Sequence, residues 1–269
     1  MEEDVVRSTS NPLVKRLVRL RERRARDREG LVLVEGAREL SRALSGGWPL
    51  ELLAWCPEVF SAEAALVADD IAARSLTRRR FAAAAFAKVS LRERPDGLLG
   101  LVRRPALGLE VLAGRRDGLY LVAAGVEKPG NVGALLRSAD AVGVDAVFVT
   151  GAGTDLGNPN VVRSSMGSLF TQSVVAADAA ALRTALREAG VRVVATSPGA
   201  ERRFWEANLR GAVAVVVGPE HEGLDQAWLD AADEVVTIPM RGRADSLNVS
   251  TAGALVLYEA LRQRNTATH

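Results

Sequence analysis

The chain has 269 residues, 35 of them Lys or Arg and 33 Asp or Glu, and its hydrophobic fraction of 48% suits a globular protein with room for two domains. It has no uncharged apolar run long enough to span a bilayer, and its N-terminus lacks the basic-then-apolar layout of a signal peptide, so we expect a cytoplasmic protein that does not enter a membrane. Its one cysteine, Cys56, excludes an intrachain disulfide, and two histidines beside it are too few for a structural zinc site, so we predict no bound metal.

The first hundred residues alternate short helical and strand patterns. Residues 11–29 place leucines at helical spacing among arginines, with Asn11 as a candidate N-cap and Pro12 at the first helical position, which predicts one amphipathic basic helix. Strands are predicted at 31–36, 51–56, 75–78 and 97–103, and further helices at 37–45, 61–74 and 81–90. We therefore expect a small α/β domain in residues 1–106, followed by a linker near 104–110 that contains Pro and Gly.

Positive charge is concentrated in this first domain. Residues 1–106 hold 20 basic and 15 acidic residues, whereas residues 107–269 hold 15 and 18, so the net charges are +5 and −3. Within residues 7–28 nine basic residues face two acidic ones. Such a tract can neutralise phosphates, and the alternative is a solvated helix face. We predict RNA contacts from Lys15, Arg16, Arg19, Arg23 and Arg26.

The rest of the chain alternates valine-rich strands with helices, which is typical of a mostly parallel sheet covered on both faces. Strands are predicted at 119–126, 146–150, 173–177, 192–197, 212–218 and 234–240. Helices are predicted at 131–142, 158–168, 179–189, 224–231 and 247–262. We assign residues 107–269 to a second domain and expect its ligand at the carboxyl ends of the strands.

Three of these strand ends concentrate glycine and polar residues. The first, residues 126–139 (VEKPGNVGALLRSA), has Asn131 placed to cap a helix and Arg137 in the second turn of that helix. The glycines of this segment let the backbone approach a ligand. The alternative interpretation is an ordinary capped helix with a surface arginine.

The second and third segments lie further along the chain. Residues 217–224 (VGPEHEGL) end a strand at Gly218 and then carry Glu220; His221 lacks an evident carboxylate or nucleophile partner, so we interpret it as a solvated loop residue. Residues 238–254 join a strand to a helix of small residues that suit close packing against a neighbour or a ligand. The polar and small residues concerned are Ser246, Asn248, Ser250, Ala252, Gly253 and Ala254.

In this order and spacing, the three segments resemble the signature motifs of the SpoU-type branch of the SPOUT RNA methyltransferases. The resemblance covers residues 119–262 and rests on PGNVGALLR, GPEHEGL and IPM followed by SLNVS. The first domain, with its NPLVK helix and its LVLVEG strand, resembles the ribosomal-protein-like substrate-binding domain that precedes many members.

The resemblance implies a parallel α/β domain with a C-terminal trefoil knot, assembled as a homodimer, that binds S-adenosylmethionine and methylates a ribose 2′-hydroxyl of RNA. It implies cofactor contacts from Gly218, Ile238, Ser246 and Leu247. It implies roles in catalysis for Asn131, Arg137, Glu220, Ser246 and Asn248. A separate RNA-binding domain favours 23S (large-subunit) rRNA as substrate, with a tRNA 2′-O-methyltransferase as the alternative.

The proton of the attacking hydroxyl is the main chemical problem at such a site. Arg137 is a poor base because the ordinary pKa of a guanidinium lies above ~12. We interpret it as an anchor for the adjacent phosphate and a polariser of the 2′-oxygen, with Asn131 and Glu220 orienting the arginine and the ribose. Positioning would then supply most of the acceleration, and it is worth about 7–11 kcal/mol in favourable cases.

Other functional classes are weighed against this one. Residues 150–157 (TGAGTDLG) follow a predicted strand, but the dinucleotide fingerprint G-x-G-x-x-G needs glycine where Leu156 stands, which disfavours an NAD-linked enzyme. A non-catalytic RNA-binding protein, with the α/β domain as a dimerisation scaffold, is the other class. The methylated nucleotide is left open, as is a role in resistance to a ribosome-targeting antibiotic, which no residue indicates.

Overall fold

The computed structural model describes residues 5–151, 153, 155–219 and 222–266. The chain divides into two compact units, residues 1–106 with 155–171 and residues 107–154 with 172–269. The division after Ala106 falls in the predicted linker, whereas residues 155–171, which we expected in the second domain, pack with the first unit. There Phe170 meets Trp48 edge-on, with ring centroids 4.9 Å apart.

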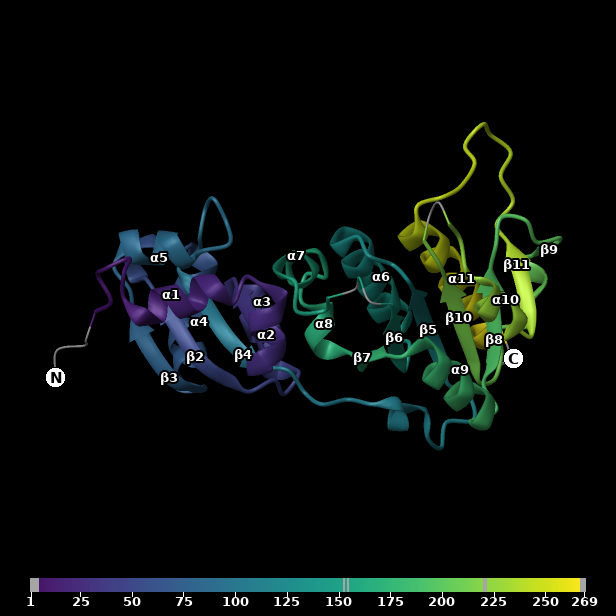
Figure 1. Cartoon of the computed structure of the whole chain (residues 1–269), viewed down its shortest axis with the longest axis horizontal. Coiled ribbons are helices and arrows are strands. Elements are labelled where there is room, and N and C mark those ends of the chain that lie inside the picture. Colours follow the sequence, from purple (N-terminus) through teal and green to yellow (C-terminus); the bar gives the residue numbers. More distant parts are fainter. Residues whose placement is uncertain (1–4, 152, 154, 220–221, 267–269) are drawn as a thin grey trace. The chain divides into compact units, whose positions relative to one another are not determined.

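The first unit has a four-stranded mixed sheet in the order β1-β4-β2-β3 (Figure 1). Strand β4 runs antiparallel to both of its neighbours, and β3 runs parallel to β2. The strands are β1 (Leu31–Glu35), β2 (Leu50–Trp55), β3 (Ser75–Arg80) and β4 (Leu98–Arg103). The helices are α1 (Pro12–Arg19), α2 (Arg23–Glu29), α3 (Ala37–Ser45), α4 (Ala62–Ala73), α5 (Ala83–Val89), α7 (Pro159–Ser164) and α8 (Ser168–Thr171).

Two helices predicted as continuous are interrupted. The predicted helix 11–29 is broken between α1 and α2, where the Arg26 side chain donates a hydrogen bond of 2.9 Å to the carbonyl of Leu20 and satisfies a group that a continuous helix would bond internally. The predicted helix 158–168 is split into α7 and α8, because Met166 and Gly167 have φ values of 52° and 89°, outside the helical region.

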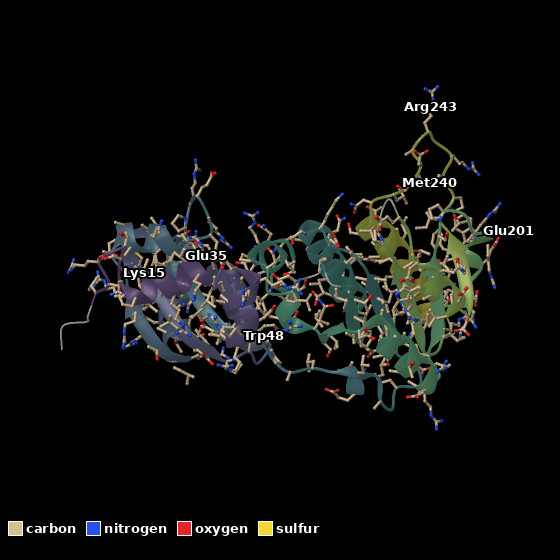
Figure 2. All side chains as sticks on the ribbon, in the orientation of Figure 1. Lys15, Glu35, Trp48, Glu201, Met240 and Arg243 are labelled. Atoms are coloured by element: carbon tan, nitrogen blue, oxygen red, sulfur yellow. The ribbon has the colours of Figure 1, made fainter. Side chains whose placement is uncertain are left out.

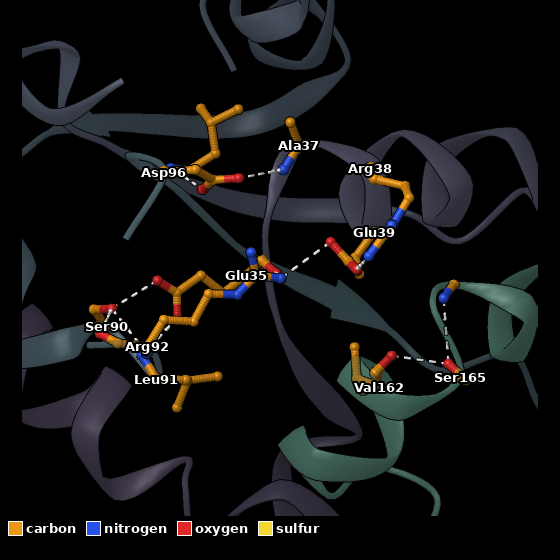
Figure 3. Close-up of polar contacts among 12 residues, drawn as sticks. Glu35, Ala37, Arg38, Glu39, Ser90, Leu91, Arg92, Asp96, Val162 and Ser165 are labelled. Atoms are coloured by element: carbon orange, nitrogen blue, oxygen red, sulfur yellow. Dashed lines mark hydrogen bonds and ion pairs between the residues drawn. The ribbon is translucent and has the colours of Figure 1, made fainter. Parts of the chain in front are cut away.

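A buried polar network joins the end of β1 to the segment that precedes β4 (Figure 3). The Glu35 carboxylate accepts hydrogen bonds from the Ser90 hydroxyl at 2.6 Å and from the amide of Leu91 at 2.5 Å. Arg92 donates to the Glu35 carbonyl at 2.7 Å and pairs with the buried Glu39 at 3.1 Å. Each buried carboxylate therefore has donors, and residues 90–92 are held against the sheet.

The second unit has a seven-stranded sheet in the order β7-β6-β5-β10-β8-β11-β9, and every neighbouring pair is parallel. The predicted parallel α/β sheet is thus confirmed. Its strands are β5 (Leu119–Ala124), β6 (Ala146–Thr150), β7 (Val174–Ala177), β8 (Arg192–Thr196), β9 (Arg202–Arg203), β10 (Val213–Val217) and β11 (Glu234–Thr237). Its α-helices are α6 (Pro129–Val142), α9 (Ala179–Glu188), α10 (Gln226–Asp230) and α11 (Val249–Asn265).

The strands differ from the prediction at one edge of this sheet. Strand β11 stops at Thr237, three residues before the predicted end, and Pro239 beyond it has no N–H for a ladder. Strand β9 was not predicted, because two polar residues carry no periodicity. The central strands β5 and β10 are fully buried, as expected for strands covered on both faces.

Helix α11 packs on α6 within the chain. A Cβ atom at Gly253 would lie 2.6 Å from a methyl carbon of Leu135, so this glycine permits the close approach of the two helices. Gly253, one of the small residues expected to pack closely against a neighbour, thus contacts another helix of the same chain. The apolar residues that α11 leaves open are Leu255 and Tyr258, which are 39% and 51% exposed.

Within the described residues, no helix is long and apolar enough to cross a membrane. The same residues contain no group of three or more His, Cys, Asp or Glu side chains arranged to hold a metal ion.

Candidate functional site

The candidate site lies at the carboxyl ends of the parallel strands in the second unit. Strands β5, β6 and β7 follow one another outward on one side of the sheet, and β10 lies on the other side of β5. The strand order therefore reverses between β5 and β10, which is where open parallel sheets bind ligands. Loops from β5, β8, β10 and β11 meet there and enclose two cavities that share residues.

The first cavity has a volume of about 370 Å³. All four predicted cofactor residues line it, although they come from three separate stretches of sequence: Gly218, Ile238, Ser246 and Leu247. Apolar side chains form much of the wall, among them Leu224, Leu229 and Val236, and the carboxylates of Glu222 and Asp245 also line it. An apolar cavity with a few polar groups is typical of small-molecule sites.

Gly218 is required by the close approach of two loop segments. A Cβ atom there would lie 2.8 Å from the carbonyl carbon of Gly223 and 2.9 Å from a methyl carbon of Leu224. Gly223 itself has a φ of 69°, a left-handed conformation that side chains disfavour. These two glycines shape the loop that follows β10, and this loop forms one side of the first cavity.

The connection from β11 to α11 forms the other side of this cavity. Figure 2 shows it extending away from the sheet, with Met240 near its base and Arg243 at its tip. Met240 and Asp245 line the cavity, and the segment returns to the sheet at Leu247 before α11 begins.

The second cavity, of about 230 Å³, adjoins the first and shares Pro219, Glu222 and Val249 with it. Lys128 and Asn131 contribute to its wall from the start of α6. The amide of Asn248 donates a hydrogen bond of 3.0 Å to the Asn131 side-chain oxygen, which joins the first and third predicted motifs. The structure therefore gathers parts of all three motifs around two connected cavities.

Some predicted positions differ in detail. Lys128, and not Asn131, is the N-cap of α6, because the helix begins at Pro129; Asn131 lies inside the first turn. Asn248 is the N-cap of α11, and its side chain accepts the amide of Ser250 at 3.0 Å. The residues that line the two cavities do not include Arg137, which is exposed on α6. Glu220 and His221 lie outside the described residues.

The sequence analysis missed several residues that line the cavities. Glu222 lines both cavities and lies in the second motif, but Glu220 was the residue predicted from that motif. Residues 196–198, at the end of β8, also line the first cavity but contain no glycine that would have marked a ligand-binding turn. Residues 196–198 reach the cavity because β8 lies beside β10 in the sheet, and this adjacency is known only from the strand order.

The basic tract of the first unit is only partly available to a ligand. Lys15, Arg19 and Arg23 are exposed, although Arg19 pairs with Glu29 at 3.3 Å and Arg23 with Asp27 at 3.5 Å. Arg16 is half-buried and also pairs with Glu29, at 2.8 Å. The prediction for Arg26 is wrong in this fold: its side chain is 4% exposed, pairs with Asp155 and bonds backbone carbonyls, so it is unavailable to an RNA phosphate. Helical spacing alone did not distinguish the buried arginine from the exposed ones.

Comparison with known proteins places these features in a family context. Residues 118–258 match the model of the SpoU rRNA Methylase family, and residues 11–100 match an MRM3-like substrate binding domain. The chain is 33% identical over 260 residues to a 23S rRNA (uridine(2479)-2′-O)-methyltransferase of Streptomyces viridochromogenes, covering 90% of this chain and 86% of that one.

Two solved structures extend the likeness to the whole fold. One, described as an RNA 2′-O ribose methyltransferase, has a TM-score of 0.83 and 47% identity, and the match covers 96% of this chain and 98% of that chain. The other is the SpoU methyltransferase AviRb of Streptomyces viridochromogenes in complex with the cofactor AdoMet. It has a TM-score of 0.86 and 30% identity, with 95% and 99% covered.

Proposed function

The chain belongs to the SpoU rRNA methylase family, and on this basis we propose that it transfers a methyl group from S-adenosylmethionine to a ribose 2′-hydroxyl of RNA, with 23S rRNA as the substrate. The observation that carries the proposal is the gathering of the three motifs around two connected cavities at the strand-order reversal. A relative that methylates 23S rRNA at a ribose 2′-oxygen and a neighbour that holds AdoMet support it. Methylation of tRNA is the alternative.

The first cavity fits S-adenosylmethionine by its chemistry. Apolar walls from Leu224, Ile238 and Leu247 suit an adenine ring, and Gly218 lines the same cavity and can offer backbone polar groups to the cofactor. The carboxylates of Glu222 and Asp245 suit the positive charges of the amino and sulfonium groups. When bound, the cofactor supplies a methyl group activated by its sulfonium.

The second cavity is where we place the reacting ribose. Asn131 and Lys128 line it and offer hydrogen-bond donors to a hydroxyl or a phosphate. Arg137, exposed further along α6, anchors the phosphate next to the target and stabilises negative charge on the 2′-oxygen. Ser246 lines the first cavity, and Asn248 orients Asn131 in the second through its hydrogen bond to that residue. Glu220 completes the set of proposed catalytic residues.

Further features of the family belong to this proposal. We propose that the segment from β11 through α11 forms the trefoil knot around the cofactor, and that two copies of the second unit associate as a homodimer through a surface that includes Leu255 and Tyr258. We assign residues 1–106 to substrate binding and residues 107–269 to cofactor binding and catalysis, in the cytoplasm where RNA is available. The exposed Lys15, Arg19 and Arg23 contribute phosphate contacts.

The experiment that tests the activity uses the purified full chain, tritiated S-adenosylmethionine and 23S rRNA, with tRNA in a parallel reaction. We expect label in 23S rRNA and a 2′-O-methylated nucleotide that is absent from rRNA of cells lacking the gene. Absence of cofactor binding at millimolar concentration, or binding of NAD instead, would contradict the proposal. RNA binding without any methyl transfer would favour a non-catalytic RNA-binding protein.

The oligomeric state is tested separately by light scattering. A homodimer has about twice the chain mass of 28.6 kDa. A monomeric mass at micromolar concentration would contradict the assembly but not the cofactor site. Replacing Tyr258 with Asp should weaken the dimer if α11 contributes its exposed face.

A further inference from the structure

We propose that a groove between α1 and β3 binds an unpaired segment of the substrate RNA, with Arg79 neutralising one of its phosphates. The inference rests on the proposed function, because it says where the first unit holds the RNA. It concerns residues outside the tract 7–28 that the sequence analysis singled out.

Strand β3 is the terminal strand of its sheet and pairs only with β2 among the described strands. Val6 forms an isolated bridge with Phe81, beyond the end of β3, and accepts and donates backbone bonds only with residues 80 and 82. Among the described residues, no strand pairs with residues 75–79 on the side away from β2. Leu76 lies in this stretch with 78% of its surface exposed.

Arg78 and Arg79 differ from the nearby arginines in whether they form ion pairs with carboxylates. Arg16 pairs with Glu29, Arg80 with Glu58 at 2.9 Å, and Arg103 with Glu51. Across the described part of the chain, neither Arg78 nor Arg79 has a carboxylate within ion-pair distance, and both are exposed. Consecutive residues of a strand point to opposite faces of the sheet, and Arg79 lines the groove whereas Arg78 does not, so one guanidinium group without a carboxylate partner is available there to an anionic ligand.

The groove itself combines charge with an apolar floor. It has a volume of about 540 Å³ and is lined by Leu13, Arg16, Glu51, Leu52, Leu76, Thr77, Arg79 and Leu101. Its one carboxylate, Glu51, is paired with Arg103 and so adds little negative charge. Lys15 is a further exposed cation on α1, the helix that contributes Leu13 and Arg16 to the groove.

This combination matches the chemistry of a single strand of RNA. Guanidinium groups bind phosphates with charge-assisted, bidentate hydrogen bonds, and apolar side chains contact the faces of bases. Base faces are accessible only where the bases are not stacked within a duplex, so the leucines of the groove favour an unpaired segment over a helix.

Charged residues on an edge strand also have a simpler role, which is to prevent edge-to-edge pairing with another chain. That role requires no groove, and an exposed leucine on the edge works against it, because an apolar side chain favours association with another chain. Leu76 lines the groove with 78% of its surface exposed, and contact with a base would explain this exposure. The experiment must still separate the two roles.

The test compares Arg79→Gln with Arg78→Gln, which removes an exposed arginine of the same strand that does not line the groove. The probe is a fluorescein-labelled, unstructured 12-nucleotide RNA, and its affinity for the full chain is measured by anisotropy from 50 to 300 mM KCl. We expect Arg79→Gln to bind about threefold more weakly at low salt and Arg78→Gln to bind like the wild type. The slope of log affinity against log salt should fall by about 0.7 in Arg79→Gln, because each phosphate contact on a single strand contributes about 0.7.

A third variant, Leu76→Ala, should weaken binding about threefold with an unchanged salt slope, because it removes an apolar contact and no charge. Binding of S-adenosylmethionine should be unchanged in all three variants, which shows that they are folded. Wild-type affinity and slope in Arg79→Gln, or equal losses in Arg79→Gln and Arg78→Gln, would overturn the inference. If an unaffected affinity came with increased aggregation, the arginines would be edge protection only.

Failure of this inference differs from failure of the proposed function. A wild-type chain that methylates 23S rRNA, together with a fully RNA-binding Arg79→Gln variant, would overturn only the groove. A wild-type chain that binds neither RNA nor S-adenosylmethionine would overturn both.

Discussion

Asn248→Ala is expected to lower the free energy of unfolding by about 1–2 kcal/mol. The side-chain oxygen of Asn248 accepts the amide of Ser250 at 3.0 Å and caps α11, and loss of such a cap typically costs about 1 kcal/mol. The side-chain amide also donates to Asn131 at 3.0 Å; this bond is exposed to solvent, so we assign it only about 0.5 kcal/mol. The two contributions arise from different atoms and can be separated.

Asn248→Ser is the matched variant, because serine caps helices well but is too short to reach Asn131. We expect its unfolding free energy to lie within about 0.5 kcal/mol of the wild type, while Asn248→Ala is less stable. Both variants should slow methyl transfer, since both release the Asn131 side chain that lines the second cavity.

The assay combines urea denaturation with single-turnover methylation at saturating cofactor. Asn131→Ala serves as the control, because it removes the bond between the asparagines and leaves the cap of α11 intact. Equal destabilisation in Asn248→Ser and Asn248→Ala would refute the capping argument. A wild-type rate in Asn248→Ser would refute the idea that the bond orients Asn131 for the reaction.

Three further perturbations follow from the same structure. Arg137→Ala should reduce the single-turnover rate by about 10²–10³ while changing the affinity for S-adenosylmethionine less than about threefold. Leu247→Arg should abolish cofactor binding, because its side chain would fill the first cavity. A fully active Arg137→Ala enzyme would show that Arg137 has no role in catalysis. Gly218→Ala should destabilise the chain by about 1–3 kcal/mol and weaken cofactor binding measured by calorimetry, because its methyl group would collide with the backbone of Gly223; normal affinity would show that the loop relaxes at little cost. Burial raises the pKa of the Glu35 carboxyl, so the folded state binds its proton more tightly than the unfolded state, and the unfolding free energy should fall as the pH rises from the ordinary glutamate pKa through the raised one. Glu35→Gln should flatten that decline in denaturation experiments between about pH 4 and 7, and an unchanged profile would assign it to other groups.

Much of the second unit could be predicted because its physical signals are local. Valine-rich runs identified the buried parallel strands, since burial on both faces requires apolar residues at consecutive positions. The glycines and polar residues of the three motifs marked the strand ends that meet at the site, and Gly218, Ile238, Ser246 and Leu247 do line one cavity. A resemblance carried by three ordered motifs then identified the family.

Features that depend on contacts between distant segments could not be predicted. The burial of Arg26 requires Asp155, which is 129 residues away, and the use of Gly253 requires Leu135 on another helix. The contribution of residues 196–198 depends on β8 lying beside β10, an adjacency that no local pattern encodes. In the same way, the arginines of β3 are exposed because β3 is the terminal strand of its sheet.

The sequence by itself determined the strands, most of the helices and the motif residues, because hydrophobic periodicity, glycine and helix caps act over a few neighbouring positions. The tertiary structure decided which of those residues face a cavity, which basic side chains remain open to RNA, and which small residue serves helix packing. These outcomes depend on the strand order and on partners far along the chain, and burial and pairing are properties of the packed fold rather than of any one segment.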